Sequence, residues 1–234
     1  MLYAVITGAS KGIGKAIAER LLKEGFSIAV CSRSRQDLES LETQWRRQYP
    51  AARIVCFPAD LAKREDVEAF GNEVLRVFER IDILVNNAGI FLPGQLASEP
   101  EGNLETLMAV NVYSAYHLTR QLLPRIKEQK SGHIFNLCSV AGLKAYPSGG
   151  AYGMSKYAMV GFSENLRLEL IPDNIRVTAI SPGATCTASW EGSGAAEERM
   201  MQAGDIAEML WAAYGLSRTA NVEQIVMRPL GGDL

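Results

Sequence analysis

Short apolar runs alternate with longer amphipathic segments along this chain, and that alternation constrains the fold more than any other feature. The runs have the length of strands buried on both faces, and the segments between them carry apolar residues at helical spacing. The apolar runs are residues 2–7, 27–32, 53–57, 81–86, 132–138, 175–181 and 223–227. The amphipathic segments are residues 12–24, 35–48, 63–79, about 103–129, 151–170 and 204–217. The pattern predicts an α/β fold in which about seven parallel strands form one doubly wound sheet with helices on both faces.

Length and composition favour a single domain over residues 1–234. A chain of 234 residues, of which 47% are hydrophobic, can bury a large core. One segment, residues 184–203, does not fit the alternation, because it mixes small residues with an EGSG turn signal. Connections of this length in α/β units are uncommon and tend to be lids or binding loops, so a substrate loop is expected there.

Charge and cysteine usage exclude several kinds of partner. The chain has 24 Lys and Arg against 26 Asp and Glu, so no nucleic acid partner is expected. The four cysteines, without a CxxC pair and with only two histidines beside them, indicate reduced thiols in a cytoplasmic protein without a structural metal. The first residues, MLYAVITGAS, predict a strand rather than a signal peptide. No apolar run approaches the roughly 20 residues that span a bilayer, so no membrane partner is expected.

A glycine-rich turn follows the first predicted strand. The sequence TGASKGIG places Gly8, Gly12 and Gly14 between that strand and the next helix. Glycine lets the backbone approach a ligand closely, and the helix offers free N–H groups and the positive end of its dipole to a pyrophosphate. A tight turn without a ligand is the alternative. The position after the first strand of a βαβ series favours a dinucleotide site and a Rossmann-type sheet.

The end of the second predicted strand indicates which dinucleotide binds. NAD sites of this fold place a carboxylate there for the ribose 2′-hydroxyl, but this chain has Ser32 and Arg33. Arg33 can pair with a 2′-phosphate, and Lys11 in the glycine turn can add a second cation, so NADP(H) is predicted. The alternative is that Arg33, Arg35 and Lys11 are ordinary surface charges. Asp60, after the third strand, can be a helix cap, a turn residue or a contact to the adenine amino group.

The sequence YGMSK places Tyr152 and Lys156 one helical turn apart. If both face a pocket, the ammonium favours the phenolate and brings the phenol's pKa, ordinarily about 10, closer to neutrality. Such a phenol can exchange protons with a substrate. Alone, however, a Tyr and Lys pair at this spacing is more often part of a solvated helix face.

Together, TGASKGIG, Asp60, NNAG at 86–89, Asn111, Ser139, YGMSK and PGATCT at 182–187 resemble the motifs of the short-chain dehydrogenases/reductases. The resemblance extends over nearly the whole chain. It implies that Tyr152 exchanges a proton with the substrate oxygen and that Lys156 holds the nicotinamide ribose and lowers the tyrosine's pKa. It also implies that Ser139 orients the substrate carbonyl and that Asn111 supports a water in a proton relay. Without the resemblance, Ser139 would be interpreted as a cap or turn serine.

The same resemblance, with the glycine turn, implies a set of NADP(H)-binding residues. These are Gly8, Ser10, Lys11, Gly12, Ile13, Gly14, Ser32, Arg33, Asp60, Leu61, Asn87, Ala88, Gly89, Tyr152, Lys156, Pro182, Gly183, Thr185 and Thr187. The family often has a bulky aliphatic residue where this chain has Thr185.

The expected function is NADPH-dependent reduction of a ketone or aldehyde to an alcohol. The first expectation is an enzyme similar to the 3-oxoacyl-[acyl-carrier-protein] reductases, which should show a basic patch near the pocket mouth. The candidates for that patch are Arg120, Arg125, Lys127 and Lys130. The alternatives are a sepiapterin-type or other small carbonyl reductase, or a non-catalytic NADP-binding regulator. Segments 103–129 and 151–170 resemble the helices through which the family forms dimers or tetramers.

Overall fold

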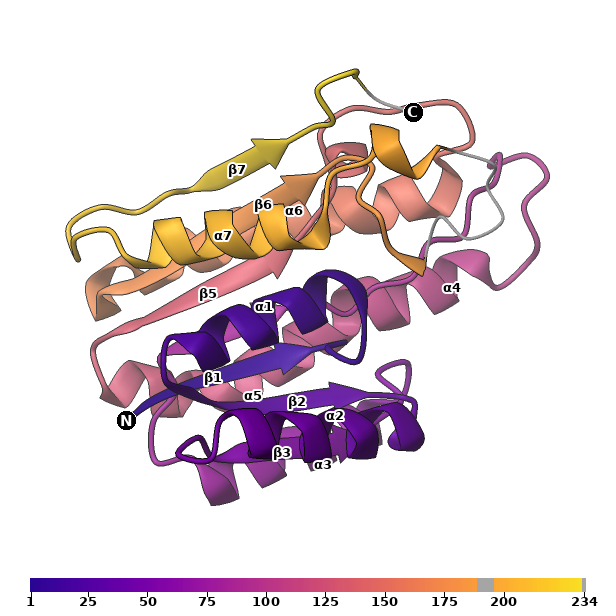
Figure 1. Cartoon of the computed structure of the whole chain (residues 1–234). Coiled ribbons are helices and arrows are strands. Elements are labelled where there is room, and N and C mark those ends of the chain that lie inside the picture. The colour runs from indigo at the N-terminus through magenta and orange to yellow at the C-terminus, as the bar shows by residue number, and fades with distance from the viewer. Residues whose placement is uncertain (189–195, 233–234) are drawn as a thin grey trace.

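A parallel sheet runs through the middle of the protein, whose computed structural model describes residues 1–188 and 196–232 (Figure 1). The seven strands found in this part of the chain lie in the order β3-β2-β1-β4-β5-β6-β7, and every pair of neighbours is parallel. The strands are β1 (Leu2–Thr7), β2 (Phe26–Ser32), β3 (Ile54–Pro58), β4 (Ile83–Asn86), β5 (Gly132–Leu137), β6 (Ile175–Pro182) and β7 (Gln224–Met227). The doubly wound parallel sheet predicted from the sequence is thus confirmed.

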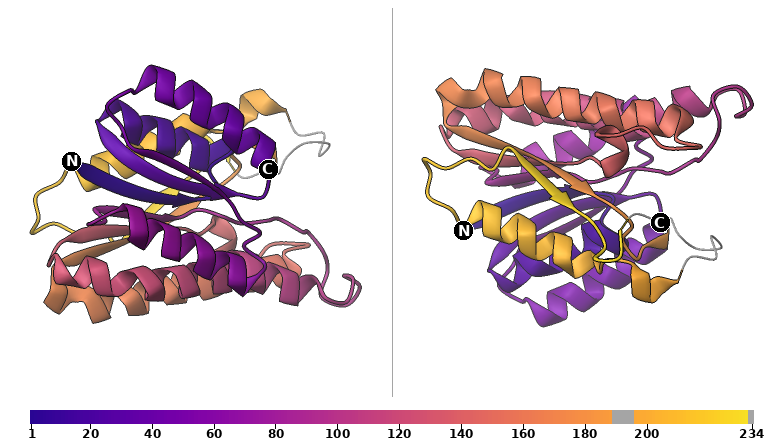
Figure 2. Two further views of the ribbon diagram at one scale, coloured as in Figure 1. Left: turned by 90° about the horizontal axis from the view of Figure 1, so that it is seen from below. Right: turned by 90° about the horizontal axis from the view of Figure 1, so that it is seen from above.

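Helices cover both faces of the sheet (Figure 2). The face covered by α1 (Gly12–Lys23), α2 (Arg35–Gln48) and α7 (Ala203–Tyr214) holds one apolar cluster, which includes Ile17, Trp45 and Leu210. The opposite face is covered by α3 (Arg64–Val77), α5 (Ser114–Glu128) and α6 (Gly150–Leu170), and Phe70 and Leu122 belong to its cluster. These clusters bury the apolar stripes of the amphipathic segments, which accounts for the two-sided architecture.

The single helix predicted over about residues 103–129 is wrong in one respect. The segment is divided into α4 (Asn103–Met108), a π-helical turn at Ala109–Tyr113, and α5. A π-helical turn contains one residue more than an α-helical turn, and such turns are frequent at functional sites. Asn111 lies within this π-helical turn. Its side chain forms hydrogen bonds with Ile90 and Ser155, so the irregular turn coincides with contacts to other segments of the chain.

The order of the strands reverses between β1 and β4, and the loops after these two strands meet there. The Asn87 backbone N–H donates to Thr7 Oγ1 at 3.0 Å. Its side-chain amide donates to the carbonyl oxygens of Thr7 at 2.8 Å and Gly8 at 3.0 Å. A crevice at such a reversal is where ligands bind in open α/β sheets, so these bonds fix the floor of the expected site.

The segment predicted as a substrate loop is described only in part, because residues 189–195 lie outside the described residues. In the described part, Thr185 forms an isolated parallel bridge with Met201, and Glu197–Arg199 form a short 3-10 turn. The two ends of the segment are therefore held together beside the carboxyl end of β6. Among the helices that the structure describes, none combines the length and apolar character needed to cross a bilayer.

Candidate active site

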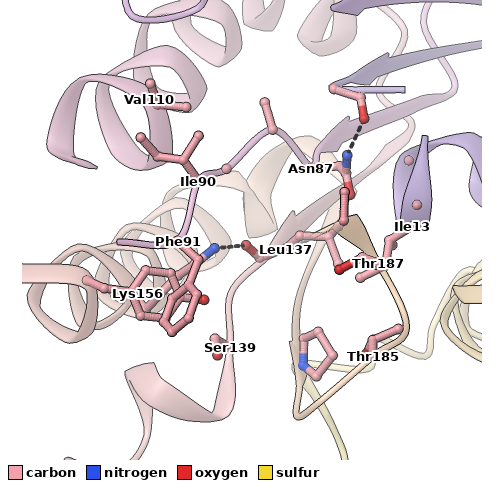
Figure 3. Close-up of a pocket in the computed structure, with 18 of the residues that line it drawn as sticks. Ile13, Asn87, Ile90, Phe91, Val110, Leu137, Ser139, Lys156, Thr185 and Thr187 are labelled. Carbon is pink, nitrogen blue, oxygen red and sulfur yellow. Dashed lines mark hydrogen bonds between the residues drawn. The ribbon is translucent and has the colours of Figure 1, made fainter. Parts of the chain in front are cut away.

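A cavity of about 1140 Å³ lies at the carboxyl ends of the strands (Figure 3). The predicted site residues line it, with the exception of Asn111. The structure therefore brings the glycine turn, Arg33, Ser139, Tyr152 and Lys156 to one pocket, although they come from distant parts of the chain. Its volume exceeds the roughly 300–1,000 Å³ of ordinary ligand pockets, which leaves room for a dinucleotide and a substrate.

The glycine turn after β1 is compact because side chains are absent. Gly8 and Gly12 have φ values of 67° and 57°, which favour glycine. A Cβ on Gly14 would lie 2.4 Å from the Gly8 carbonyl oxygen and 2.4 Å from Asn87 Nδ2, so larger residues do not fit. Lys11 precedes α1 without a side-chain cap, and the first N–H groups of α1 have no intrahelical partners. This turn can hold a pyrophosphate against the start of α1.

The end of β2 fits the 2′-phosphate of NADP(H). Ser32 Oγ is buried and has no hydrogen-bond partner among the described residues. Lys11 and Arg33 line the same pocket and form no ion pair or side-chain hydrogen bond within the described part of the chain. A hydroxyl and two cations without partners match a phosphate group, which needs donors and positive charge. The chain's own residues at this position therefore fit NADP(H).

Asp60 lines the cavity and lies in a turn. Its carboxylate accepts from the Ala62 N–H at 3.2 Å, while Lys63 is the residue that precedes α3. The suggestion that Asp60 caps this helix is therefore wrong, because the N-cap position is occupied by Lys63, three residues later. The Asp60 backbone N–H donates to the Asp66 carboxylate at 2.8 Å, and this bond connects the turn to the first turn of α3.

Tyr152 and Lys156 come from the first two turns of α6, and both line the pocket. Lys156 is buried, its Nζ donates to the Leu137 carbonyl oxygen at 3.0 Å, and this nitrogen lies 5.8 Å from the centre of the Tyr152 ring. Figure 3 shows the bond to Leu137, which anchors the ammonium at the end of β5. The pair therefore faces a pocket and not solvent.

The pKa of Tyr152 differs from the sequence-based expectation. Burial raises the pKa of Tyr152 above 10.0, and the neighbouring Ser139 hydroxyl offsets this only in part. Burial also lowers the pKa of Lys156 from 10.5. Desolvation disfavours both charged forms, so here it outweighs the expected effect of the ammonium on the phenol. The phenol is therefore protonated at neutral pH, which suits a proton donor.

Ser139 has two contacts at once. Its hydroxyl accepts from the Ala141 N–H at 3.1 Å and so caps the short 3-10 turn Val140–Gly142. The same residue lines the pocket beside Tyr152. The structural and the functional interpretations of this serine are thus compatible, since the hydroxyl that caps the turn also lies within hydrogen-bonding reach of Tyr152.

Asn111 lies outside the pocket lining and connects two walls of the site. Its side-chain amide exchanges hydrogen bonds with the backbone of Ile90, at 2.8 and 3.1 Å, and donates to Ser155 Oγ at 3.0 Å. A Cβ on Gly89 would lie 3.3 Å from Asn111 Oδ1 and 3.5 Å from Lys156 Nζ. Asn111 and Lys156 therefore both lie close to Gly89. The side-chain amide of Asn111 is hydrogen-bonded to Ile90 and Ser155.

The turn after β6 closes the far side of the pocket. Gly183 N–H donates to the Met227 carbonyl oxygen at 2.8 Å, and Thr185 Oγ1 donates to the Gly183 carbonyl oxygen at 3.0 Å. Thr187 Cγ2 lies next to the glycine turn. A Cβ on Gly12 would be only 3.2 Å from this methyl carbon. The PGATCT segment thus reaches the glycine turn, and Thr185 and Thr187 both line the cavity (Figure 3).

Sequence reasoning missed several lining residues. Phe91 lies two residues after the NNAG motif, and Tyr146 lies between Ser139 and Tyr152. Their proximity to recognised motifs was the available signal. Arg228, which follows β7, also lines the pocket, and only the sheet order brings it there. Within the described residues, no group of three or more His, Cys, Asp or Glu side chains could hold a metal ion.

Comparison with known proteins agrees with this arrangement. The sequence profile of the short chain dehydrogenases matches residues 2–198. An uncharacterized oxidoreductase of Staphylococcus epidermidis is 33% identical over 227 residues, which cover 97% of this chain and 96% of the relative. A sepiapterin reductase of Chlorobaculum tepidum is 33% identical over 238 residues, covering 98% and 97% of the two chains.

A similar solved structure is an alcohol dehydrogenase from the archaeon Thermococcus sibiricus in complex with 5-hydroxy-NADP. It superposes with a TM-score of 0.91 at 28% identity and covers 98% of this chain and 97% of its own. Profile, relatives and fold agree over most of the chain. The protein therefore belongs to the short-chain dehydrogenase/reductase family and is an oxidoreductase.

Proposed function

We propose that this protein uses NADPH to reduce the carbonyl group of a small ketone or aldehyde to an alcohol, with Tyr152 as the proton donor. The observation that carries the proposal is the single pocket lined by the glycine turn, Arg33, Ser139, Tyr152 and Lys156. The complex of a similar alcohol dehydrogenase with 5-hydroxy-NADP supports the choice of nucleotide. The unpartnered Ser32 hydroxyl supports it independently.

Each catalytic group has a task that its surroundings suit. NADPH, when bound, supplies the hydride. Tyr152, protonated because burial raises its pKa, gives its proton to the substrate oxygen as negative charge develops there. Ser139 donates a hydrogen bond to the same oxygen. Lys156, held by the Leu137 carbonyl, directs the remaining N–H donors toward the ribose of the cofactor.

The arrangement of α5 favours a small substrate over an acyl group on a carrier protein. The four cations considered for a carrier-protein patch do not line the pocket. Arg125 donates to the Phe78 carbonyl oxygen at 2.7 Å, and Lys127 and Lys130 both pair with Asp173. Arg120 stacks over the Tyr116 ring. Since these charges are engaged elsewhere, they support no basic patch at the mouth, and we favour the small-molecule alternative.

A panel of substrates tests the proposal. Purified protein is assayed for NADPH oxidation with a diketone, an aromatic aldehyde, sepiapterin and an acetoacetyl thioester, with NADH in parallel. We expect turnover of at least one of the small carbonyl compounds, with NADPH preferred over NADH. Turnover of the thioester alone would favour the carrier-protein function. Tight NADPH binding without reduction of any carbonyl compound would contradict catalysis and favour the regulator.

We also propose that the protein forms a homodimer or homotetramer through α5 and α6. Large side chains on these helices are exposed, including Tyr116 at 40%, Met154 at 49%, Tyr157 at 46% and Leu168 at 59%. Aromatic and methionine side chains are enriched at protein interfaces, and exposed apolar patches mark interaction surfaces. Both helices cover the same face of the sheet (Figure 2).

A further inference from the structure

Two aromatic residues, Phe91 and Tyr146, line the pocket near Tyr152. The Phe91 ring packs edge-on against the Tyr152 ring, with centroids 4.7 Å apart and an interplanar angle of 80°. Tyr146 also lines the pocket, and its pKa is raised to about 12, chiefly by burial and further by Tyr152. Val140, Lys144, Ala145 and Pro147 line the pocket as well. Both aromatic residues therefore lie in the part of the pocket that holds the proposed proton donor.

Tyr146 rests on glycine and leaves its ring open to the pocket. A Cβ on Gly149 would lie 3.1 and 3.2 Å from two carbons of the Tyr146 ring, so glycine leaves the space that this ring occupies. Tyr146 as a whole residue is 39% exposed, and its hydroxyl has no hydrogen-bond partner among the described residues. An exposed aromatic face inside a pocket can stack on a planar ligand.

The segments that carry the two rings are fastened to each other. Gly94 N–H donates to the Ser148 carbonyl oxygen at 3.0 Å, and the Ala151 N–H donates to the Glu99 carboxylate at 3.3 Å. Gly150 has a φ of 39°, and a Cβ there would lie 2.4 Å from the Gly94 carbonyl oxygen. Because these contacts are made within the protein itself, the wall is formed before a substrate enters, which lowers the cost of binding.

Polar side chains suited to a chain of hydroxyl groups lie at the other end of the cavity. Among the described lining residues, the Asp, Glu, Asn and Gln side chains are Asp37, Asp60 and Asn87. Asp37 belongs to α2 and Asp60 follows β3, while Asn87 bonds to the glycine turn. Apart from Lys144, the lining residues of segment 144–147 are Ala145, Tyr146 and Pro147, which suit a flat, apolar group better than a chain of hydroxyl groups.

We propose that Phe91 and Tyr146 form an aromatic slot that selects substrates whose carbonyl group is attached to a planar aromatic ring. The inference rests on the proposed function and deepens it, because it names the substrate class of the same site. The carbonyl oxygen lies at Tyr152 and Ser139, and the ring of the substrate lies between Phe91 and Tyr146. Specificity then comes from stacking and shape, with hydrogen bonds only at the reacting oxygen.

The test compares acetophenone with cyclohexyl methyl ketone, which has the same carbon skeleton but a saturated ring. kcat/KM is measured for both ketones with wild type, F91L, Y146L and Y146F, and NADPH affinity is measured for each variant. We expect Y146L and F91L to lower kcat/KM for acetophenone about tenfold relative to cyclohexyl methyl ketone. Y146F keeps the ring and should keep the wild-type ratio of the two values.

Several results separate the slot from the proposed function. Equal losses for both ketones in Y146L would overturn the slot, and so would a change of the ratio in Y146F as large as in Y146L. The slot would also be overturned if the wild type preferred the saturated ketone and neither F91L nor Y146L changed the ratio of the two kcat/KM values. If wild type reduces neither ketone nor any compound of the panel above, the proposed function fails first. NADPH affinity that stays constant across the variants shows that the cofactor end is intact.

Discussion

Arg33 carries most of the predicted preference for NADPH at the scale of single residues. We expect Arg33→Ala to raise the KM for NADPH about tenfold to a hundredfold, because charge-assisted hydrogen bonds to the 2′-phosphate are lost. The KM for NADH should change little, since NADH lacks this phosphate. Arg35→Ala is the matched control, because Arg35 is an exposed neighbour outside the described pocket lining. Similar effects on both nucleotides would argue against a 2′-phosphate contact.

The pKa shifts of Tyr152 and Lys156 predict how reduction depends on pH. The Tyr152 pKa lies above 10.0, so the donor stays protonated through neutral pH, while the lowered Lys156 pKa brings the loss of its charge below 10.5. We expect kcat for reduction to be flat from about pH 6 to about pH 8 and to fall in the alkaline range. A kcat that rises steadily with pH over the neutral range would indicate that the phenolate is the active form, contrary to this account.

Motifs predicted the lining residues well where the chemistry requires one residue type. Glycine at positions 8, 12 and 14, a cation at 33 and the phenol and ammonium of α6 all have physical reasons that sequence shows. The sign of the Tyr152 pKa shift was not predictable, because it depends on how deeply the pair is buried. Tyr146 and Phe91 were missed since an aromatic residue near a motif can as easily belong to the core.

At the scale of elements, the start of α6 depends on Glu99. This carboxylate accepts from the Ala151 N–H at the first turn, one residue before Tyr152. We expect Glu99→Ala to lower the free energy of unfolding by about 1 kcal/mol and to lower kcat, because the turn that carries Tyr152 loosens. Denaturant unfolding and steady-state kinetics measure the two effects.

Two further variants make the Glu99 prediction specific. Glu99→Gln keeps an oxygen that can accept from the Ala151 N–H, so it should recover most of the lost kcat. Glu101→Ala removes an exposed carboxylate from the same loop and should leave the unfolding free energy within about 0.5 kcal/mol of wild type. If Glu99→Ala behaves like Glu101→Ala in both measurements, Glu99 does not position the helix.

The alternating pattern predicted the elements, whereas their irregularities required the three-dimensional structure. Residues 35–48 form a helix with the predicted bounds, because Ser34 caps it and the apolar stripe is regular. The π-helical turn at Ala109–Tyr113 was invisible, since apolar residues continue on both sides of it. It is accompanied by bonds from Asn111 to Ile90 and Ser155, which lie far away in the sequence.

At the scale of the whole molecule, the exposed face of α5 and α6 predicts self-association. We expect light scattering after size exclusion to give the mass of a dimer or tetramer, and Tyr157→Arg to shift the population toward smaller species. A charge buried in an interface costs several kcal/mol unless it is paired, which explains the expected shift. Met209→Arg on α7, which covers the opposite face, is the control and should keep the wild-type mass. A wild-type protein that stays monomeric at every concentration contradicts this prediction.

We infer that the buried phenol of Tyr152 delivers the proton at a pocket that binds NADPH. The most direct measurement pairs NADPH affinity with turnover for wild type and Tyr152→Phe, using the best substrate of the panel. We expect the affinity for NADPH to change little and kcat to fall by about a hundredfold or more, because the general acid is gone. Reduction by Tyr152→Phe at the wild-type rate would contradict the account.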